Sequence, residues 1–408
     1  MKKLMVLGAG SGQLDIIQKA QRRGICVIAV SPYGDYPGLK IADKTYDLDV
    51  RDEEAILETA IKEKIDGIIT DQTDMAMRTV AYVAEHMGLP GIGYDCACLF
   101  TDKYAMRRRS EELGLPTIKS AVTDSVEEAE AFFKDLGKPA IIKPVDNQGS
   151  RGIYKIECID DIAANYEKAR AFSKSQRVII EQYVDGDEYE VNSLVINGVE
   201  HTLCVGDLLM FEQPGIFTSR CRLYPSCRDE QEVARLLKLN KDTVEGFGLV
   251  NGLTHSEYRA DRDGTVYLIE AAARGGGAHV SSDIIGLQTG FDTSEHLIDF
   301  ALGLAGDAPQ FETELCHCGT FSFYLPAGRV ISVEGVREAM ALPFMRGNDL
   351  HEIEEGMITK ECYDKTGRYI SVLVADSRDE LMQHFDQYRK LINIKVETED
   401  GIRGPVWK

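Results

Sequence analysis

Two glutamates, Glu257 and Glu270, lie on either side of a predicted β-hairpin and could together bind a divalent cation. Residues 253–260 and 265–269 read as strands, and Asp263-Gly264 between them is a strong turn signal. If Asp263-Gly264 is a two-residue loop, Glu257 pairs directly with Glu270 across the hairpin. Side chains in such a pair lie about 4.5–5.5 Å apart, where like charges repel. We therefore expect a positive ion, Mg²⁺, between the two carboxylates.

The length of the loop decides whether the two carboxylates share a face. A four-residue loop would shift the glutamates to a diagonal on one face, whereas a three-residue loop would place them on opposite faces. Two of these three registers keep the pair together. The alternative interpretation is that both are solvated acids on an edge strand, since the chain has 67 acidic residues.

A lysine and a glycine-containing loop upstream of the hairpin are suited to bind phosphate. Lys143 ends an apolar predicted strand, so its ammonium can point at phosphate oxygens as a compact charge. The loop that follows contains Gly149 and Gly152, which let backbone amides approach a phosphate closely, and Ser150 adds a hydroxyl donor. A surface lysine and an ordinary hairpin loop are the alternatives.

Two further segments have residue types suited to nucleotide chemistry. The segment 181–184 ends a predicted strand and could offer backbone groups to an adenine edge, and Glu188 could accept hydrogen bonds from ribose hydroxyls. Arg274 follows Glu270 by four residues and precedes three glycines, which brings a permanent cation beside the proposed metal. A glycine run after a strand is also typical of a plain turn.

These side chains need a scaffold, and the chain begins with one. Residues 1 to about 100 alternate apolar strands with amphipathic helices, the pattern of a parallel α/β sheet. Gly8-x-Gly10-x-Gly12 follows the first strand, where an anion could meet helix N-terminal amides. The last glycine falls one residue early for a dinucleotide fingerprint. A plain tight turn, a ligand other than a dinucleotide, and NAD therefore all stay open.

Charge and composition argue against several classes of protein. A net charge of −21 opposes binding to a nucleic-acid backbone, which requires clustered Lys and Arg. The apolar run at the N-terminus is too short for a signal peptide or a membrane span, so we expect a soluble, cytoplasmic protein. The ten cysteines are scattered without zinc-site spacing, which favours free thiols in a reducing compartment.

A chain of 408 residues is too long for one core and suggests several domains. We predict an α/β domain over residues 1–100, an α+β domain over 101–305 and a C-terminal α+β domain over 306–408. The middle domain would contain the lysine, the glycine loop and the hairpin.

In their order along the chain, these features resemble the ATP-grasp superfamily. The run is Asp102-Lys103, Lys143-Pro144, Gly149-Ser150-x-Gly152, Glu181-x-x-Val184-x-Gly186-x-Glu188, Glu257, Glu270 and Arg274. The resemblance spans nearly the whole chain. It implies a Rossmann-like pre-ATP-grasp domain, a two-part ATP-grasp domain whose lid covers about residues 115–185, and a C-terminal domain like that of L-amino acid ligases.

The resemblance also implies a role for each matching residue. The ATP-binding residues would be Lys103, Lys143, Gly149, Ser150, Gly152, Glu181, Gln182, Tyr183, Val184 and Glu188. Among them, the lysines would contact the α- and β-phosphates, the glycine loop would fold over the triphosphate, the segment 181–184 would form the adenine hinge, and Glu188 would hold the ribose. Glu257 and Glu270 would bind Mg²⁺, for which Mn²⁺ can substitute. Arg274 would act as the catalytic cation on the transferring phosphate or acyl phosphate.

One departure from the family pattern concerns the metal. Many members carry Asn two residues after the second metal glutamate, where this chain has Ala272. One metal ligand is therefore missing, and water could replace it. His255 shares a strand face with Glu257 and could line the substrate site or simply pack there. Gly276 and His279, in and after the glycine run, are the other candidate substrate residues.

The implied activity is that of an ATP-dependent ligase, which activates a carboxylate as an acyl phosphate and joins it to an amine. Residues 271–277 look closer to L-amino acid ligases than to other branches. The alternatives are a purine-biosynthesis-type ligase similar to phosphoribosylglycinamide synthetase, a non-catalytic ATP-binding protein, and an NAD-dependent oxidoreductase. Expected partners are the small-molecule carboxylate and amine, without nucleic acid or membrane, and a homodimer is common among relatives.

Overall fold

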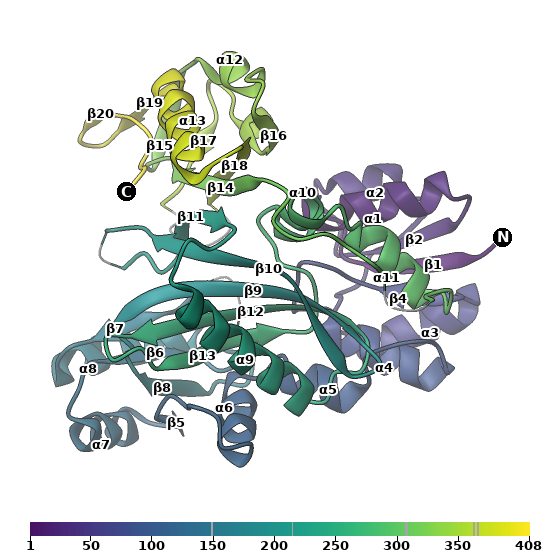
Figure 1. Ribbon diagram of the computed structural model, residues 1–408, viewed down its shortest axis with the longest axis horizontal. Helices are drawn as coiled ribbons and strands as arrows, with labels where there is room; N and C mark the ends of the chain where they lie inside the picture. Colours follow the sequence, from purple (N-terminus) through teal and green to yellow (C-terminus); the bar gives the residue numbers. More distant parts are fainter. Residues whose placement is uncertain (148–149, 214, 307–308, 362–363, 365–366) are drawn as a thin grey trace.

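The computed structural model arranges the strands of this chain in four sheets (Figure 1). It describes residues 1–147, 150–213, 215–306, 309–361, 364 and 367–408, and the sheets lie within these ranges. One sheet is parallel and the other three are antiparallel, so the predicted combination of α/β and α+β architecture is confirmed.

The parallel sheet is formed by the N-terminal part of the chain and has the strand order β3-β2-β1-β4. Its strands are β1 (Lys3–Leu7), β2 (Cys26–Val30), β3 (Lys44–Tyr46) and β4 (Gly67–Ile69). The helices that connect them are α1 (Ser11–Arg22), α2 (Pro37–Ile41), α3 (Glu53–Glu63) and α4 (Met77–Met87). The middle strands β1 and β2 are almost wholly buried, as expected for parallel strands covered on both faces.

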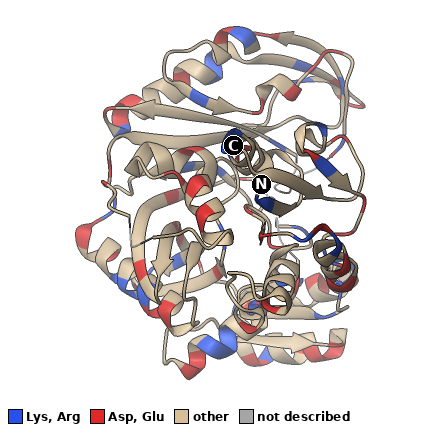
Figure 2. Ribbon diagram, turned by 90° about the vertical axis from the view of Figure 1, so that its right-hand side faces the viewer, with Lys and Arg blue, Asp and Glu red and all other residues tan. Residues whose placement is uncertain are grey.

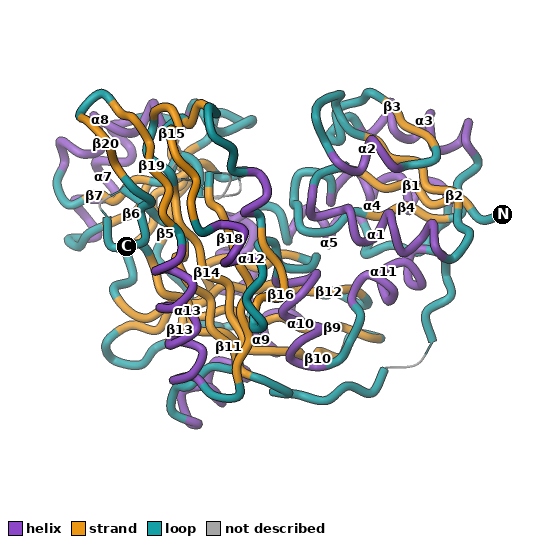
Figure 3. Tube along the Cα trace, turned by 90° about the horizontal axis from the view of Figure 1, so that it is seen from above, coloured by secondary structure: helices purple, strands orange, loops and turns teal. Residues whose placement is uncertain are grey.

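A helix from much later in the chain packs on this parallel sheet. The helix α11 (Thr293–Ala301) lies beside α1 and β4 (Figures 1 and 3). Arg23, at the end of α1, forms ion pairs with Glu295 at 2.7 Å and with Asp299 at 2.5 Å. On β4, a side chain added at Gly67 would place its Cβ 2.4 Å from the backbone oxygen of Ala301. Glycine at this position therefore allows the strand to touch the helix.

The next unit is a small antiparallel sheet with the order β5-β8-β6-β7. It follows the helices α5 (Tyr94–Leu99) and α6 (Lys103–Glu112). Its elements are β5 (Ser120–Thr123), α7 (Val126–Leu136), β6 (Ala140–Pro144), β7 (Tyr154–Ile156), α8 (Ile159–Arg170) and β8 (Val178–Gln182). Apolar residues of β6 and β8 pack with α8 residues such as Ile162 and Tyr166 in a separate small core. This unit covers most of the residues expected for the lid.

The largest sheet has eight strands in the order β13-β12-β9-β10-β11-β14-β18-β16. The first five in that order are β13 (Val266–Ala272), β12 (Gly252–Asp261), β9 (Gly186–Ile196), β10 (Val199–Met210) and β11 (Ser219–Tyr224). Because side chains alternate along a strand, one face carries Tyr189, Val191 and Tyr258 into a core with the helix α9 (Glu230–Gly246). The other face carries charged side chains, among them Glu190 and Glu257.

The C-terminal part of the chain contributes to this large sheet and also forms a small one. Strands β14 (His317–Tyr324), β16 (Met345–Asn348) and β18 (Arg368–Ala375) extend the large sheet. The small sheet has the order β17-β15-β19-β20, with β15 (Gly328–Glu334), β17 (Ile358–Thr359), β19 (Asn393–Thr398) and β20 (Gly401–Arg403). The remaining elements are the π-helix η1 (Val280–Ile284), α10 (Ile285–Thr289), α12 (Val336–Met340), the 3₁₀ helix η2 (Leu350–Glu352) and α13 (Arg378–Leu391). The domain boundaries at residues 100 and 305 stay a prediction.

The hairpin of β12 and β13 pairs Glu257 with Glu270, as predicted, but its turn and its register differ from those expected. The expected two-residue loop is wrong: Asp261 N donates to Thr265 O, and from there Ala260 pairs with Val266. That turn alone would put the glutamates on opposite faces. An extra residue on β13, Ile269, lies opposite the step from Glu257 to Tyr258, and this β-bulge shifts the register by one residue and restores the pair.

Acidic and basic residues are interspersed over the molecule (Figure 2). The chain has 67 acidic and 46 basic residues, which gives the net charge of −21. Among the described residues, no helix is both long enough and apolar enough to span a bilayer.

We expect Gly67→Ala to lower the free energy of unfolding by about 2 kcal/mol, the usual cost of overpacking a core. The added methyl group would meet the backbone of α11, which cannot move aside as a flexible side chain would. Urea denaturation measures the change. Gly306→Ala is the matched control, because Gly306 has open space around it. Equal stability of the two variants would contradict the close packing of β4 on α11.

Candidate functional site

A cleft with an empty volume of about 880 Å³ brings together most of the residues predicted to bind the nucleotide and the metal. Its walls come from β6, β8, α6 and the charged face of the large sheet. The predicted residues that line it are Lys103, Lys143, Ser150, Glu181, Gln182, Tyr183, Val184, Glu188, Glu257 and Glu270. Gly152 packs against Phe172 beside it, and Gly149 lies outside the described residues.

Lys143 is held in the cleft by a buried charge cluster. Its Nζ lies 2.5 Å from Glu181, and Arg107 Nε donates to the same carboxylate at 2.8 Å. Burial alone would raise the pKa of Glu181, but the two cations lower it to about 2. Burial lowers the pKa of Lys143, an effect that the Glu181 carboxylate opposes. The side chain of Glu181 thus fixes Lys143, which leaves contact with a base to the backbone of segment 181–184.

Lys103 connects the glycine-loop side of the cleft with the hairpin. Its Nζ donates to Asn147 O at 2.7 Å and lies 2.8 Å from Glu270 Oε1. Burial would lower the pKa of Lys103, but the negative charge of Glu270 raises it above its usual value. A permanent positive charge is thereby placed between the loop after β6 and the carboxylate predicted to bind a metal.

The predicted adenine hinge has part of its backbone engaged by neighbouring segments. Gln182 N donates to Lys119 O at 2.8 Å, and Tyr183 N donates to Pro139 O at 2.9 Å. Val184 O accepts from Arg259, whose other terminal nitrogen donates to Glu188 at 2.8 Å. Within the described residues, the Val184 N–H has no hydrogen-bond acceptor. This free donor at the cleft edge could bind a ring nitrogen.

Three glutamates form a row across neighbouring strands on the charged face. Glu190 of β9 pairs with Glu257 of β12, which pairs with Glu270 of β13. In the next row, His255 lies between Asn192 and Ala272. Side chains of directly paired residues share a face. The sequence prediction therefore found two members of this row and missed Glu190, although its position two residues after Glu188 on a strand was a usable signal.

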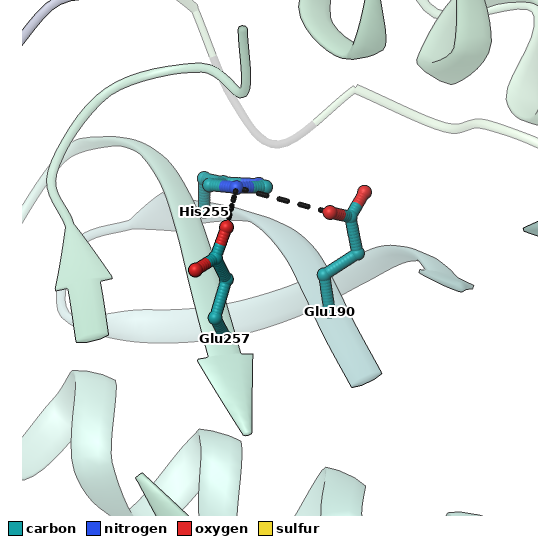
Figure 4. Close-up of side chains that lie close together, drawn as sticks. All are labelled: Glu190, His255 and Glu257. Atoms are coloured by element: carbon teal, nitrogen blue, oxygen red, sulfur yellow. Dashed lines mark ion pairs between the residues drawn. The ribbon is translucent and has the colours of Figure 1, made fainter. Parts of the chain in front are cut away.

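Glu190, His255 and Glu257 point toward one another (Figure 4). His255 Nε2 lies 3.5 Å from Glu257 Oε1 and 3.9 Å from Glu190 Oε2. Arg222 of β11, also missed from the sequence, lies 2.8 Å from Glu190 and 3.7 Å from Glu257. Glu190 is fully buried, and neither of its oxygens accepts a hydrogen bond from a described residue.

These carboxylates fit a divalent cation. Mg²⁺ takes oxygen ligands, usually one or two carboxylates together with phosphate oxygens and water. Glu257 and Glu270 supply such oxygens at the cleft wall, and the buried Oε1 of Glu190 has no hydrogen-bond donor among the described residues. Glu257 and Glu270 are thus placed to hold a cation against the phosphates of a bound nucleotide.

Arg274, Gly276 and His279 are not among the described residues that line this cleft. Arg274 forms a two-pronged ion pair with Asp74 of the N-terminal part, at 3.0 and 2.8 Å. A Cβ at Gly276 would lie 2.8 Å from His255 Nδ1, so glycine there leaves room for the ring. No sequence signal indicated Asp74 as the partner of Arg274, because 200 residues separate them.

The glycine turn after β1 is filled by a side chain of the chain itself. Gly10 N donates to Gln13 Oε1 at 3.1 Å, and Gln13 Nε2 donates to Asp71 O at 2.6 Å. Gln13 is buried, and a Cβ at Gly8 would meet its amide oxygen at 2.8 Å. This packing supports the interpretation of a plain tight turn.

A second cleft, with an empty volume of about 1360 Å³, adjoins the first. The two share the lining residues Lys103, Asn147, Arg151 and Glu270. Arg78 lies on its wall, where Nε donates to Thr101 Oγ1 at 2.6 Å, and it forms no ion pair with a described residue. Exposed Met75 and Phe172 add apolar surface. This space can hold a small anionic molecule next to the first cleft.

Comparison with known proteins shows which sequences and folds this chain resembles. Residues 136–283 match the family model described as ATP-grasp domain. The chain is 27% identical over 361 residues to the formate-dependent phosphoribosylglycinamide formyltransferase of Janthinobacterium sp. (strain Marseille), covering 84% of each chain.

Two solved structures are similar in fold over nearly the whole chain. The L-amino acid ligase from Bacillus licheniformis has a TM-score of 0.85 at 21% identity and covers 98% of this chain and 99% of its own. The phosphoribosylglycinamide synthetase from Anaerococcus prevotii has a TM-score of 0.76 at 18% identity, with coverage of 96% and 99%.

We expect the free energy of unfolding to fall as pH rises from about 6.5 to about 10, through loss of the charge on His279. Burial alone would lower the pKa of His279, but hydrogen bonds to Asp283 at 2.8 Å and Asp349 at 3.1 Å raise it to about 10. Because the folded-state pKa lies above the usual 6.5, the stabilisation is complete below pH 6.5 and is lost as pH passes through 10.

Urea denaturation at a series of pH values measures this effect. His279→Gln removes the charge and should flatten the slope between pH 6.5 and 10. His201→Gln is the control, because His201 forms no ion pair with a described residue, and it should keep the wild-type slope. Identical slopes for wild type and His279→Gln would show that the imidazolium does not hold η1 to the segment around Asp349.

Proposed function

We propose that this chain, an ATP-dependent ligase of the ATP-grasp superfamily that forms C–N bonds, joins a small carboxylate to the amine of a second small molecule. The observation that carries the proposal is that Lys103, Lys143, Glu257 and Glu270 all line one cleft. The Val184 N–H, which has no acceptor among the described residues, lies at the edge of the same cleft. Such a set can bind the adenine, neutralise the phosphates and hold a divalent cation at the same time.

In the proposed reaction, the chain's own side chains position the substrates and neutralise the charge of the phosphates. A carboxylate oxygen of the first substrate attacks the γ-phosphorus of ATP, and ADP leaves as the P–O bond to it breaks. The amine then attacks the acyl carbon, loses a proton to solvent, and phosphate leaves. Lys143 and Lys103 would neutralise phosphate charge, and in-line transfer depends mainly on such positioning and electrostatics. Mg²⁺, when bound by Glu257 and Glu270, would supply further neutralisation of the phosphate oxygens.

Several residues would act around the reacting atoms without taking part in bond changes. The glycine loop that includes Ser150 would cover the triphosphate and keep water from the acyl phosphate. Arg274 is already paired with Asp74, so we propose that it acts on the acyl phosphate from this fixed position. His255, Gly276 and His279 stay candidates for the substrate side of the cleft.

For the substrates, we propose formate, or another small carboxylate, and the amine of phosphoribosylglycinamide. The sequence relatives named formate-dependent phosphoribosylglycinamide formyltransferase favour this pair over the amino-acid ligase branch that residues 271–277 suggested. Ligation of two amino acids is the second candidate, favoured by the similarity in fold to the Bacillus licheniformis enzyme. The second cleft is the proposed site of the amine substrate, with Arg78 facing its phosphate or carboxylate.

A substrate screen tests the function. ADP release is measured with formate, acetate and the common amino acids, each combined with phosphoribosylglycinamide or an amino acid, and products are identified by mass spectrometry. We expect ADP release that requires a specific carboxylate and amine. Glu270→Gln should lower kcat by about a hundredfold or more, since it removes phosphate-charge neutralisation worth several kcal/mol. ATP-analogue binding should weaken far less.

Glu58→Gln, on the exposed face of α3, is the matched control and should keep the wild-type kcat. Tight binding of an ATP analogue without turnover in any combination would count against the ligase. Full activity of Glu270→Gln would exclude Glu270 as a metal ligand.

Arg78→Ala should raise the KM of the amine substrate about tenfold to a hundredfold, because a charged hydrogen bond is worth about 1.5–3 kcal/mol. The KM of ATP should not change, since Arg78 lines the second cleft and not the first. Steady-state kinetics with each substrate varied in turn measures both constants. Arg22→Ala removes an exposed arginine on α1 and is the control. An equal rise in both KM values, or none, would remove Arg78 from the substrate site.

A further inference from the structure

The arrangement around His255 leaves three electron-rich groups facing one another. His255 Nδ1 lies 2.8 Å from Asn192 Oδ1, and because a carbonyl oxygen only accepts, Nδ1 carries the proton in this contact. The other ring nitrogen, Nε2, faces Glu257 Oε1 at 3.5 Å and Glu190 Oε2 at 3.9 Å. Ligand oxygens of the two carboxylates lie within 4.8 Å of each other, where like charges repel unless a positive charge lies between them.

Arg222 is a cation beside Glu190. It lies 2.8 Å from Glu190 Oε2, and its other terminal nitrogen is 3.7 Å from Glu257. Glu190 Oε1 is buried and has no hydrogen-bond donor among the described residues, although a buried charge without partners is strongly unfavourable. A carboxylate has about four acceptor positions, so Glu190 can bind Arg222 and a metal together.

The distances are those of a site that a metal ion could close. One ligand atom from each of Glu190, His255 and Glu257 lies within 4.8 Å of the others. Ligand atoms bound at about 2.1 Å from an ion lie at most about 4.2 Å apart, so shifts of a few tenths of an ångström would suffice. The partner of His255 across the hairpin is Ala272, which offers no ligand atom.

We propose that His255 and Glu190 are metal ligands that, with Glu257, complete the coordination of a divalent cation at the first strand of the hairpin. An imidazole ligand favours a borderline ion such as Mn²⁺ over Mg²⁺, which prefers an all-oxygen site. The site would therefore select Mn²⁺ more strongly than two carboxylates alone would. This inference rests on the proposed function only in that a cation accompanies the nucleotide.

Electron spin echo spectroscopy of Mn²⁺ tests direct ligation without any need for turnover. Mn²⁺ is added to the full-length protein with a non-hydrolysable ATP analogue, and coupling to an imidazole ¹⁴N is sought. We expect this coupling in the wild type and in His201→Ala, a control histidine on β10, which is separated from β12 by β9. We expect it to be absent in His255→Ala. A bound Mn²⁺ without nitrogen coupling in the wild type would overturn the proposal.

Metal titration gives the second readout. His255→Ala and Glu190→Gln should each weaken Mn²⁺ binding about tenfold or more, and His255→Ala should weaken Mg²⁺ binding much less. His255→Asn, whose amide oxygen can still bind a metal, keeps the test valid if the alanine variant folds poorly, and it should shift preference from Mn²⁺ toward Mg²⁺. Unchanged affinities for both ions would overturn the proposal. Nitrogen coupling without turnover would instead refute the proposed ligase and leave this inference standing.

Discussion

The crowding of carboxylates on one face of the large sheet is the constraint on which the site depends. Glu190, Glu257 and Glu270 lie in one row across three adjacent strands, where their charges repel. The cations beside them come from other parts of the chain, Arg222 from β11 and Lys103 from α6. The repulsion within this row is relieved only when β11 is paired in the sheet and α6 is packed against it. Formation of the cleft therefore depends on the fold around it.

The same principle operates across the cleft, where Glu181 lies between Lys143 and Arg107. This cluster is fully buried, and loss of one partner from a buried ion pair costs about 3–5 kcal/mol, whereas a surface pair is worth about 0–1 kcal/mol. Glu181 therefore keeps Lys143 fixed on β6 before any ligand arrives. The ion pair of Arg274 with Asp74 likewise joins two segments that lie far apart in the sequence.

The hairpin illustrates how far local sequence can be followed. Turn chemistry and alternation predicted the pairing of Glu257 with Glu270, yet the turn has a different length, and a bulge at Ile269 corrects the register. A bulge depends on how a strand packs against its neighbours, and β12 is bordered by β9 as well as β13. The N-terminal glycines were ambiguous for a related reason, because only the packing of Gln13 into the turn distinguishes a tight turn from an anion site.

The sequence by itself determined the alternating α/β start, the α+β character of the rest of the chain, the order of lysines, glycine loop and acids that marks the superfamily, and the two opposed glutamates. These features depend on residue type and on spacings of a few positions. Only the tertiary structure decided that Glu190 joins the row, that Arg222 neutralises it, and that His255 faces both carboxylates. Strands β9, β11 and β12 are separated by long connections, and their mutual register is set by packing and charge across the whole sheet, which no local spacing encodes.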